Sequence, residues 1–282
     1  MKENTFKAAA IQMPTVPDKM ENVRAAERYL ERLAAQKPDF VLLPEMFCCP
    51  YQTQNFPVYA EEEGGPAWEM MAGLAKTYGI YLIAGSMPER DNQGKIFNTS
   101  YVFDRQGKQI GKHRKAHLFD IDVKGGQQFK ESDTLTPGNR DTVFDTEFGK
   151  MGVCICYDIR FPEMLRMTVN DGARMVFVPA AFNMTTGPAH WEISFRVRAL
   201  DNQIYMLGCA PARDPSTGYV SWGHSILTDP WGRVVKELDE KEGILLETID
   251  LGYEDGVRQQ LPLLKHRRQD MYRLEKVWEE NA

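Results

Sequence analysis

The sequence predicts a single α/β domain whose sheets mix parallel and antiparallel strands. Short apolar runs alternate with longer amphipathic stretches, which is typical of strand–helix–strand units. Two neighbouring apolar runs are joined by a tight turn that contains glycine, which indicates a hairpin and therefore antiparallel pairing. With 282 residues, 43% of them hydrophobic, and no low-complexity segment or linker, the chain is long enough to bury a substantial core.

The first half of the chain shows the alternation most clearly. Between 18 and 36, apolar residues recur near helical spacing at Val23, Ala26, Leu30 and Leu33. A second helical stretch stops at Gly79, and glycine is the usual residue of a left-handed helix cap. The predicted elements are strand 6–12, helix 18–36, strand 40–43, helix 68–78, strand 80–84, and a hairpin of 96–104 and 108–112 that turns at 105–107.

The second half continues in the same style. Pro162 is suited to the first turn of a helix, where its missing N–H is not needed. The elements predicted here are strand 151–156, helix 162–170, strand 174–178, helix 189–201, and strands 204–209, 225–229, 232–236 and 244–249. The tail 261–282 is charged and aromatic, and we expect it to pack on another subunit. The predicted domain therefore spans 1–282.

The charge and hydropathy of the chain exclude several classes of protein. The net charge is −6, and short basic clusters such as 112–115 are too small for a nucleic-acid-binding face. No apolar run approaches the length that crosses a membrane, and the segment 1–7 lacks the apolar core of a signal peptide. We therefore expect a cytoplasmic protein that binds neither nucleic acid nor membrane.

The cysteine count also points to a reducing compartment. There are five cysteines in a large chain, so a disulfide framework is not expected and at least one free thiol remains. Most cysteines act only as small buried apolar side chains. A reactive role therefore needs local evidence at each of the positions Cys48, Cys49, Cys154, Cys156 and Cys209.

Three segments carry residues suited to catalysis, each where a predicted strand gives way to a loop. Glu45 ends an apolar strand in 42–45, at the kind of edge where α/β proteins build their sites. Lys115 precedes an apolar stretch and is a candidate for partial burial. Taken alone, Glu45 is more typical of a surface carboxylate in a loop, and Lys115 of a solvated basic cluster, so neither decides the chemistry.

The strongest of the three segments surrounds Cys156. A strand predicted to end at Cys156 is followed within a few residues by a helix, so the thiol is expected at a sharp turn near a helix N-terminus. Backbone N–H groups and the helix dipole there favour a thiolate, and the Tyr157 N–H is available to a developing oxyanion. Cys154, two residues earlier, is expected inside the strand in a structural role.

Together these motifs resemble the nitrilase superfamily. The sequence contains L-P-E ending at Glu45, R-K-x-H-L around Lys115, and C-Y-D-x-R-F-P-E beginning at Cys156. That superfamily uses a Glu-Lys-Cys triad in this chain order. The resemblance, which covers nearly the whole chain, implies a four-layer αββα sandwich, a homodimer paired through the sheet-flanking helices, and no metal or organic cofactor.

Within the superfamily the chain resembles the omega-amidase branch, whose members hydrolyse the terminal amide of 2-oxoglutaramate and 2-oxosuccinamate. The segments that carry this likeness are 117–122, 129–132, 181–192, 211–214 and 222–225. One departure is Cys48-Cys49, which stands where a small or polar residue is more usual before Pro50. We expect this pair near the entrance of the pocket, where it bears on fine specificity.

The resemblance implies a role for each site residue. Cys156 would form a thioester, with Glu45 as the base and Lys115 and the Tyr157 N–H stabilising the oxyanion. Glu131 matches a second glutamate that would hold Lys115 and the substrate amide. The candidates for the rest of the substrate pocket, by motif position, are Tyr51, Arg160, Thr185 and Thr186, with Phe182 as a wall. Alternatively, Arg160 braces the turn by pairing with Asp158 or Glu163.

Other functions remain open on the sequence. An N-carbamoyl-amide hydrolase or a true nitrilase would use the same triad, and a dimeric interaction protein could share the fold. A metal site is a weaker rival. His113 and His117 are four residues apart and Cys154 and Cys156 two apart, but no C-x-x-C pair supports it.

Overall fold

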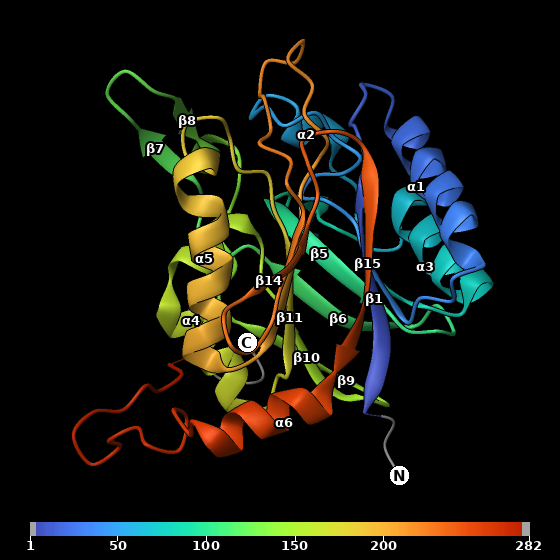
Figure 1. Ribbon diagram of the computed structural model, residues 1–282. Coiled ribbons are helices and arrows are strands. Elements are labelled where there is room, and N and C mark those ends of the chain that lie inside the picture. Colours follow the sequence, from blue (N-terminus) through green and yellow to red (C-terminus); the bar gives the residue numbers. More distant parts are fainter. Residues whose placement is uncertain (1–3, 278–282) are drawn as a thin grey trace.

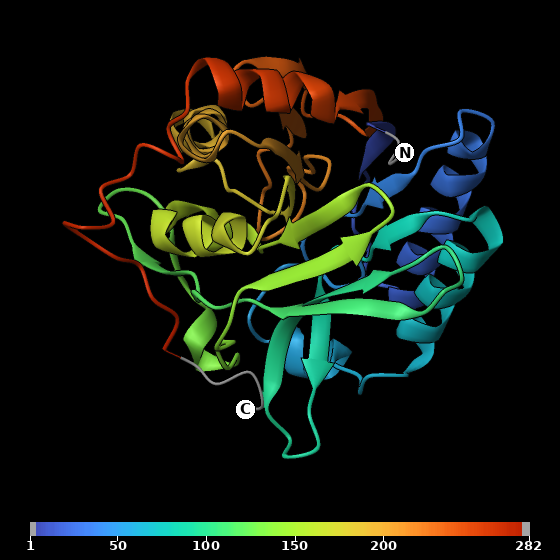
Figure 2. The same ribbon diagram turned by 90° about the horizontal axis from the view of Figure 1, so that it is seen from below.

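The protein is built in four layers, with two sheets packed face to face between two pairs of helices. In the computed structural model, which describes residues 4–277, α1 (Lys19–Ala34) and α3 (Pro66–Tyr78) cover one sheet. The helices α4 (Pro162–Asn170) and α5 (Gly187–Asn202) cover the other (Figures 1 and 2). This is the predicted αββα sandwich. The outermost ends of the predicted domain and tail lie outside the described residues.

The first sheet has a parallel centre and antiparallel edges. Its strands follow the order β15 (Gly243–Asp250), β1 (Thr5–Gln12), β2 (Phe40–Leu42), β3 (Tyr81–Ile83), β5 (Ile96–Phe103) and β4 (Met87–Arg90), with β6 (Gln109–Arg114) also paired to β5. The strands β1, β2 and β3 are parallel, whereas β15 and the β5–β6 hairpin pair antiparallel. The predicted mixed sheet and hairpin are confirmed.

The second sheet repeats this plan. Its order is β14 (Val234–Glu237), β13 (Ile226–Thr228), β12 (Tyr205–Cys209), β11 (Met175–Pro179), β10 (Gly149–Val153) and β9 (Thr142–Thr146). The strands β10, β11 and β12 are parallel. A small separate ribbon pairs β7 (Asp120–Asp122) with β8 (Gln128–Lys130). Each main sheet therefore offers the carboxyl ends of three parallel strands, the edge where such folds place their sites.

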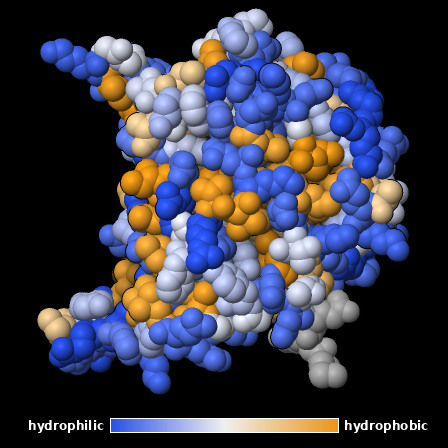
Figure 3. Space-filling model, viewed as in Figure 1, coloured by the Kyte–Doolittle hydropathy of each residue, from blue (hydrophilic) through white to orange (hydrophobic). Residues whose placement is uncertain are grey.

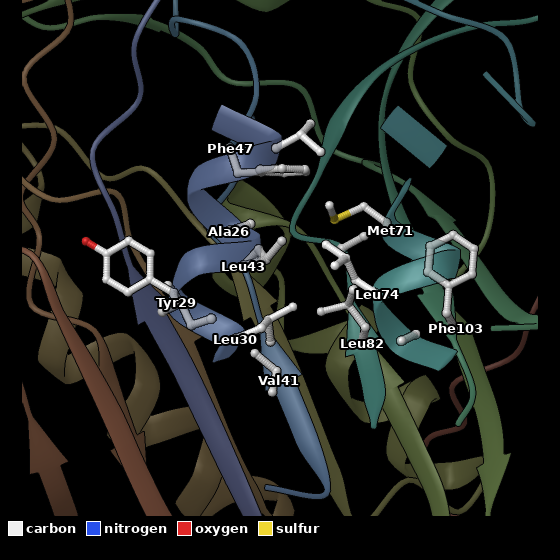
Figure 4. Close-up of a cluster of buried hydrophobic side chains, with 14 of the residues drawn as sticks. Ala26, Tyr29, Leu30, Val41, Leu43, Phe47, Met71, Leu74, Leu82 and Phe103 are labelled. Carbon is white, nitrogen blue, oxygen red and sulfur yellow. The ribbon is translucent and has the colours of Figure 1, made fainter. Parts of the chain in front are cut away.

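Three apolar clusters hold the layers together. Along β1, Ala9 and Ile11 join the cluster under α1 and α3, while Ala8 and Ala10 face the second sheet, as the period of two in a strand requires. Figure 4 shows the first of these clusters, with Leu30 of α1 directed at the strands. The third cluster fills the space between the second sheet and the helices α4 and α5.

Most predicted elements are present, and one boundary is wrong. The predicted cap at Gly79 is left-handed, with φ of 62°. The strand predicted over 151–156 ends at Val153, so Cys154 and Cys156 lie beyond it. Elements that the sequence pattern did not predict are α2 (Phe56–Tyr59), β4, β7, β8, β9, the short 3₁₀ helices η1 (Glu131–Asp133) and η2 (Cys156–Arg160), and α6 (Leu251–Gln260).

The described part of the tail contacts its own chain. The Gln203 side chain donates to the Leu261 carbonyl at 2.5 Å, and Leu264 packs against the cluster between the second sheet and its helices. Further along, Lys276 forms an ion pair with Asp141 at 2.8 Å. Among residues 4–277 there is no helix long and apolar enough to span a membrane.

Candidate active site

The three predicted catalytic side chains are buried at one edge of the two sheets. Glu45 follows the carboxyl end of β2, Lys115 follows β6, and Cys156 follows β10. Each is almost fully excluded from solvent. Because the two sheets pack face to face, residues from both meet at this edge.

The two oxygens of the Glu45 carboxylate have different surroundings. Its Oε1 accepts hydrogen bonds from Lys115 Nζ at 2.8 Å, Asn98 Nδ2 at 2.9 Å and the Tyr51 hydroxyl at 3.0 Å. Its Oε2 is buried and accepts no hydrogen bond from any described residue. Burial, and then the charge of Glu131, raise the pKa of Glu45 above its ordinary value, against the opposing effect of Lys115.

Lys115 is held between two carboxylates. Its Nζ lies 2.8 Å from Glu45 Oε1 and 3.0 Å from Glu131. Its backbone is also fixed, because its N–H donates to the Asn98 carbonyl at 2.8 Å and its carbonyl accepts from the Gly138 N–H at 2.8 Å. Burial alone would lower the pKa of Lys115, but Glu131 and Glu45 outweigh it and raise the pKa. The ammonium therefore stays charged.

Glu131 lies where the family resemblance expects a second glutamate. It opens η1, and its Oε1 accepts from Lys115 Nζ at 3.0 Å and from the Tyr51 hydroxyl at 2.5 Å. Its Oε2 accepts from the Phe119 N–H at 2.7 Å. Tyr51, predicted in the substrate pocket, therefore lies with its hydroxyl between the Glu45 and Glu131 carboxylates, which share its single proton, and the shorter contact is to Glu131.

Cys156 occupies a strained turn. The chain leaves the second sheet after Val153, and Cys156 opens η2 with φ of 45°, a conformation that costs a residue with a side chain roughly 1–2 kcal/mol. The positive φ explains why the strand cannot continue to Cys156 as predicted. Cys154, although outside the strand, keeps a hydrogen bond from its N–H to the Phe177 carbonyl at 3.1 Å and is buried.

The surroundings of Cys156 favour a neutral thiol. Burial is the largest influence, and together with the charge of Glu45 it raises the pKa of the thiol well above its ordinary value. Lys115 and the backbone of Ala181 act in the opposite direction but do not prevail. The thiolate expected from the helix dipole is therefore not the resting form. A buried thiol beside a carboxylate needs that carboxylate as its base.

A cavity of about 370 Å³ opens beside Glu45, and its lining includes neither Lys115 nor Cys156. Its wall includes Glu45, Cys49, Tyr51, Ala181 and Tyr219, and the wall residues carry no cationic side chain. Cys49 therefore lines the cavity as predicted, while its neighbour Cys48 packs in the cluster under α1 and α3. The rings of Tyr51 and Tyr219, 4.5 Å apart, also border a more open groove outside.

Arg160, which follows the Cys156 turn in η2, has a charge that no carboxylate in the described chain pairs with. Its guanidinium lies 4.6 Å from the centre of the Phe182 ring, and NH1 lies 3.1 Å from Nδ1 of His190. It forms an ion pair with neither Asp158 nor Glu163, so that predicted alternative is wrong. Burial lowers the pKa of Arg160, and its Nε is buried without a hydrogen-bond partner among residues 4–277.

The predicted threonines lie in the turn before α5. The Asn183 side-chain oxygen accepts from the Thr185 N–H at 3.0 Å and from the Thr186 hydroxyl at 3.1 Å. Thr186 is thus engaged by Asn183, whereas Thr185 borders the outer groove. Phe182 is buried edge-on against Trp191, with ring centres 5.1 Å apart.

Sequence reasoning missed several residues of the site. Asn98 is a polar residue in the wholly buried strand β5, a signal that could have been used. Tyr219 lies in a loop that gave no pattern, yet it is buried and donates to the Ala181 carbonyl. His113 and His117, considered above as metal ligands, both contact the buried carboxylate of Asp158, at 3.0 and 2.8 Å.

The chain is similar to known carbon–nitrogen hydrolases along most of its length. The carbon–nitrogen hydrolase family model matches residues 7–259. The chain is 47% identical to omega-amidase NIT2-A of Xenopus laevis over 96% of this chain and 98% of that protein. It is 46% identical to omega-amidase NIT2 of Mus musculus over the same shares of the two chains.

Solved structures share the fold. Nit3 of Saccharomyces cerevisiae, a member of branch 10 of the nitrilase superfamily, superposes with a TM-score of 0.87 at 41% identity, over 94% of this chain and 97% of that one. A variant of the amidase from Nesterenkonia sp. AN1, whose active-site cysteine carries the acetamide moiety of fluoroacetamide, superposes with a TM-score of 0.79 at 25% identity, over 94% of this chain and 95% of that one.

Proposed function

The chain belongs to the carbon–nitrogen hydrolase family, and on that premise we propose that it hydrolyses the terminal amide of a short oxo-dicarboxylic acid monoamide. The substrates that fit best are 2-oxoglutaramate and 2-oxosuccinamate. The two relatives named omega-amidases, at 47% and 46% identity over nearly the whole chain, support this class. The products are the dicarboxylic acid and ammonia.

The observation that carries the mechanism is the asymmetry of Glu45. One oxygen is occupied by three donors, and the other is buried and unpartnered. In our proposal, Oε2 takes the proton of the Cys156 thiol as the sulfur attacks the amide carbon. The same proton then passes to the leaving ammonia as the carbon–nitrogen bond breaks. A water molecule, deprotonated by Glu45, hydrolyses the thioester and frees the acid.

Lys115 supplies a fixed positive charge. Its pKa is raised by Glu131 and Glu45, although burial opposes them, so it is not a base at neutral pH. Its role in the proposal is to stabilise the tetrahedral oxyanion with the Tyr157 N–H, which lies in the first turn of η2 and has no acceptor within that helix. Glu131 and Tyr51 hold the ammonium in place for this role.

Arg160 is the proposed partner of the substrate's own carboxylate. It is a half-buried cation with no carboxylate partner in the described chain and with one buried N–H free. An anionic substrate would supply the missing partner, and a charge-assisted hydrogen bond contributes about 1.5–3 kcal/mol. Phe182 lies against the guanidinium face and fixes its direction.

The test is a substrate panel read by ammonia release. We expect kcat/KM to be highest for 2-oxoglutaramate or 2-oxosuccinamate, lower for the neutral aliphatic amide of equal length, and lowest for an N-carbamoyl amino acid and an aliphatic nitrile. Cys156→Ala should be inactive on every compound, while Cys154→Ala should retain activity. A clear preference for the carbamoyl compound or the nitrile would keep the triad and overturn the proposed substrate.

An Arg160→Gln variant isolates the anion contact. It should lower kcat/KM for the anionic amide roughly tenfold or more, as expected for the loss of one charge-assisted hydrogen bond. The neutral amide, which has no carboxylate for Arg160 to bind, is the matched control and should be affected much less. An equal loss on both amides would contradict the assignment of Arg160.

The assembly and location that we propose are a homodimer and the cytoplasm. The face of α5 away from the sheet exposes Ile193, Val197 and Leu200, and Figure 3 shows apolar surface on the side of the molecule that carries this helix. Exposed apolar patches commonly mark subunit contacts. All five cysteines are free thiols, which suits a reducing compartment.

A further inference from the structure

One buried carboxylate joins the two segments that carry Lys115 and Cys156. Asp158, in η2, is completely excluded from solvent. Its Oδ1 accepts from the His117 N–H at 2.9 Å and from His117 Nδ1 at 2.8 Å. Its Oδ2 accepts from the Ile155 N–H at 3.0 Å and from His113 Nε2 at 3.0 Å. Both oxygens are therefore doubly occupied.

The positions of these residues along the chain show which two segments the cluster connects. His113 and His117 flank Lys115, two residues before it and two after it, while Asp158 comes two residues after Cys156. The Lys115 backbone is itself anchored to β5 through Asn98. Asp158 therefore bridges the anchored segment of Lys115 and the strained turn of Cys156. In the described chain it is the only carboxylate that both segments bind.

The charge state of Asp158 suits a bridge of this kind. Burial alone would raise its pKa, but the hydrogen bonds from His113 and His117 outweigh burial and hold the pKa below its ordinary range. It is therefore a carboxylate, which only accepts hydrogen bonds. Both facing imidazole nitrogens must then carry protons.

We propose that Asp158, with His113 and His117, forms a positioning clamp that fixes Cys156 relative to Lys115 and Glu45. The clamp touches no reacting atom. It holds the Ile155 N–H and so the positive-φ turn at Cys156, while it holds the far side of Lys115 through His117. His117 also stacks on Phe161, with ring centres 3.7 Å apart, so the contacts of the clamp extend to the start of α4.

This inference rests on the proposed roles of Lys115 and Cys156, and the chemistry of an amide makes the substitution Asp158→Asn informative. An asparagine would place an NH₂ group where one oxygen stands. A neutral histidine can change tautomer and accept from it, but the Ile155 or His117 backbone N–H cannot. Every orientation of the amide therefore sets one donor against a fixed donor.

The expected effect is on turnover more than on substrate binding. A displacement of reacting groups by a fraction of an ångström to an ångström costs up to about 10²-fold in rate, so Asp158→Asn should lower kcat by about that factor and change KM by less than about threefold. The control is Glu254→Gln, because Glu254 is another buried carboxylate, paired with Arg174 and Arg258 far from the site. That variant should lose stability and keep its kcat.

Two variants of His117 separate clamping from packing, even if Asp158→Asn does not fold. Asparagine at 117 can place its NH₂ where His117 Nδ1 stands, so His117→Asn restores the hydrogen bond and loses the stack on Phe161. His117→Phe keeps the stack and loses the hydrogen bond. We expect kcat of His117→Asn to stay within about threefold of the parent, and that of His117→Phe to fall roughly tenfold or more. The reverse order would show that packing alone matters and would overturn the clamp.

The closing measurement is the rate at which iodoacetamide alkylates Cys156, followed by intact mass and peptide mapping, alongside ammonia release. Alkylation needs the thiol in place but no particular substrate. In Asp158→Asn and His117→Phe it should slow together with kcat, and adding His117→Phe to Asp158→Asn should slow it little further, because both substitutions break the same hydrogen bond. Parent-like alkylation and turnover in folded Asp158→Asn would refute the clamp alone. Full ammonia release by folded Cys156→Ala would instead refute the proposed function.

Discussion

The two oxygens of the Glu45 carboxylate differ in their hydrogen bonding. Oε1 is fixed by Lys115, Tyr51 and Asn98, which hold the side chain in one rotamer, while Oε2 is left free toward chemistry. A buried polar atom without a partner costs stability, so its survival at this position is consistent with use in a reaction. The burial of Glu45 and Cys156 also makes turnover depend on pH.

The pH profile of kcat/KM follows from the raised pKa values. Burial raises the pKa of Glu45 above its ordinary 4.5 and raises that of Cys156 above 9.0. The pair must lose a proton before the thiol can be activated, so activity should rise with pH along a limb that lies above pH 4.5. Because Glu131 and Glu45 raise the pKa of Lys115 above 10.5, outweighing burial, no falling limb from Lys115 is expected below that pH. The apparent pKa values read from this profile belong to Glu45 and Cys156 together, because their titrations are coupled.

The measurement is a pH series of initial rates with circular dichroism at each pH to confirm that the protein is folded. Glu45→Asp serves as the comparison, since it keeps a carboxylate while moving it. A falling limb near neutrality, in protein that stays folded, would mean that Lys115 loses its proton there, and would contradict the strongly raised pKa of that ammonium.

At the level of single residues, motifs predicted the identities but not the contacts. Glu45, Lys115 and Cys156 were found because each follows a strand in a short distinctive motif. Asn98 and Tyr219 were not found, because their roles depend on contacts with residues far along the chain. The thiolate predicted from the helix dipole was wrong, since burial and the charge of Glu45 outweigh the dipole at Cys156.

At the level of elements, periodicity located the long helices and the central strands, and short elements escaped it. The helix α6 was missed although Asp250 caps it, accepting from the N–H groups of Gly252 and Tyr253. The error at the end of β10 has a local cause. An apolar run continues through Ile155, but Asp158 draws the Ile155 N–H out of the ladder, and side-chain hydrogen bonds of this kind compete with strand pairing.

The loop that carries Glu45 depends on a close approach at Gly85. This residue, after β3, has φ of +43°, and a Cβ built there would lie 2.1 Å from the Pro44 carbonyl oxygen. The approach lets the Ser86 N–H donate to that carbonyl at 3.3 Å and lets Ser86 Oγ accept from the Met46 N–H at 3.0 Å. Glu45 is thus held between two docked residues.

Gly85→Ala should therefore damage both stability and turnover. A left-handed conformation costs roughly 1–2 kcal/mol for alanine, and the overpacking against Pro44 adds about 1–3 kcal/mol, so the free energy of unfolding should fall by about 2–5 kcal/mol. The matched control is Gly79→Ala, where φ is +62° and nothing lies within 4 Å of the added Cβ. Denaturant melts and kcat should show a loss of stability alone in the control. If kcat of folded Gly85→Ala equalled that of the control, docking of this loop would not position Glu45.

At the level of the whole molecule, the four layers place the site by bringing the carboxyl edges of two parallel strand sets together. Sequence alternation predicted the α/β class, and the resemblance supplied the number and order of the layers. Periodicity could not supply them, because β1 buries both faces, with Ala8 and Ala10 on one side and Ala9 and Ile11 on the other. A run buried on both faces does not reveal which layer it contacts.

In the four-layer fold the outer face of α5 is exposed and apolar. In the proposed dimer a second copy of the chain would bury this face. Ile193, Val197 and Leu200 are 61%, 37% and 37% exposed, spaced four and three residues apart on one side of the helix. Nearby, Trp231 is 41% exposed in the turn after β13, where the Gly232 carbonyl accepts from Arg196 of α5. Helix and turn together present one apolar surface.

Ile193→Glu should therefore dissociate the protein, because burying an unpaired charge in an apolar contact costs several kcal/mol. Sedimentation velocity of the parent should give twice the 32.3 kDa chain mass, and the variant should give one chain mass at the same concentration. Val58→Glu is the matched control, since Val58 is 78% exposed on α2, away from α5, and its dimer should persist. A dimer that survives Ile193→Glu and Val197→Glu, or a parent that sediments as a monomer, would show that the apolar face of α5 is not a dimer interface.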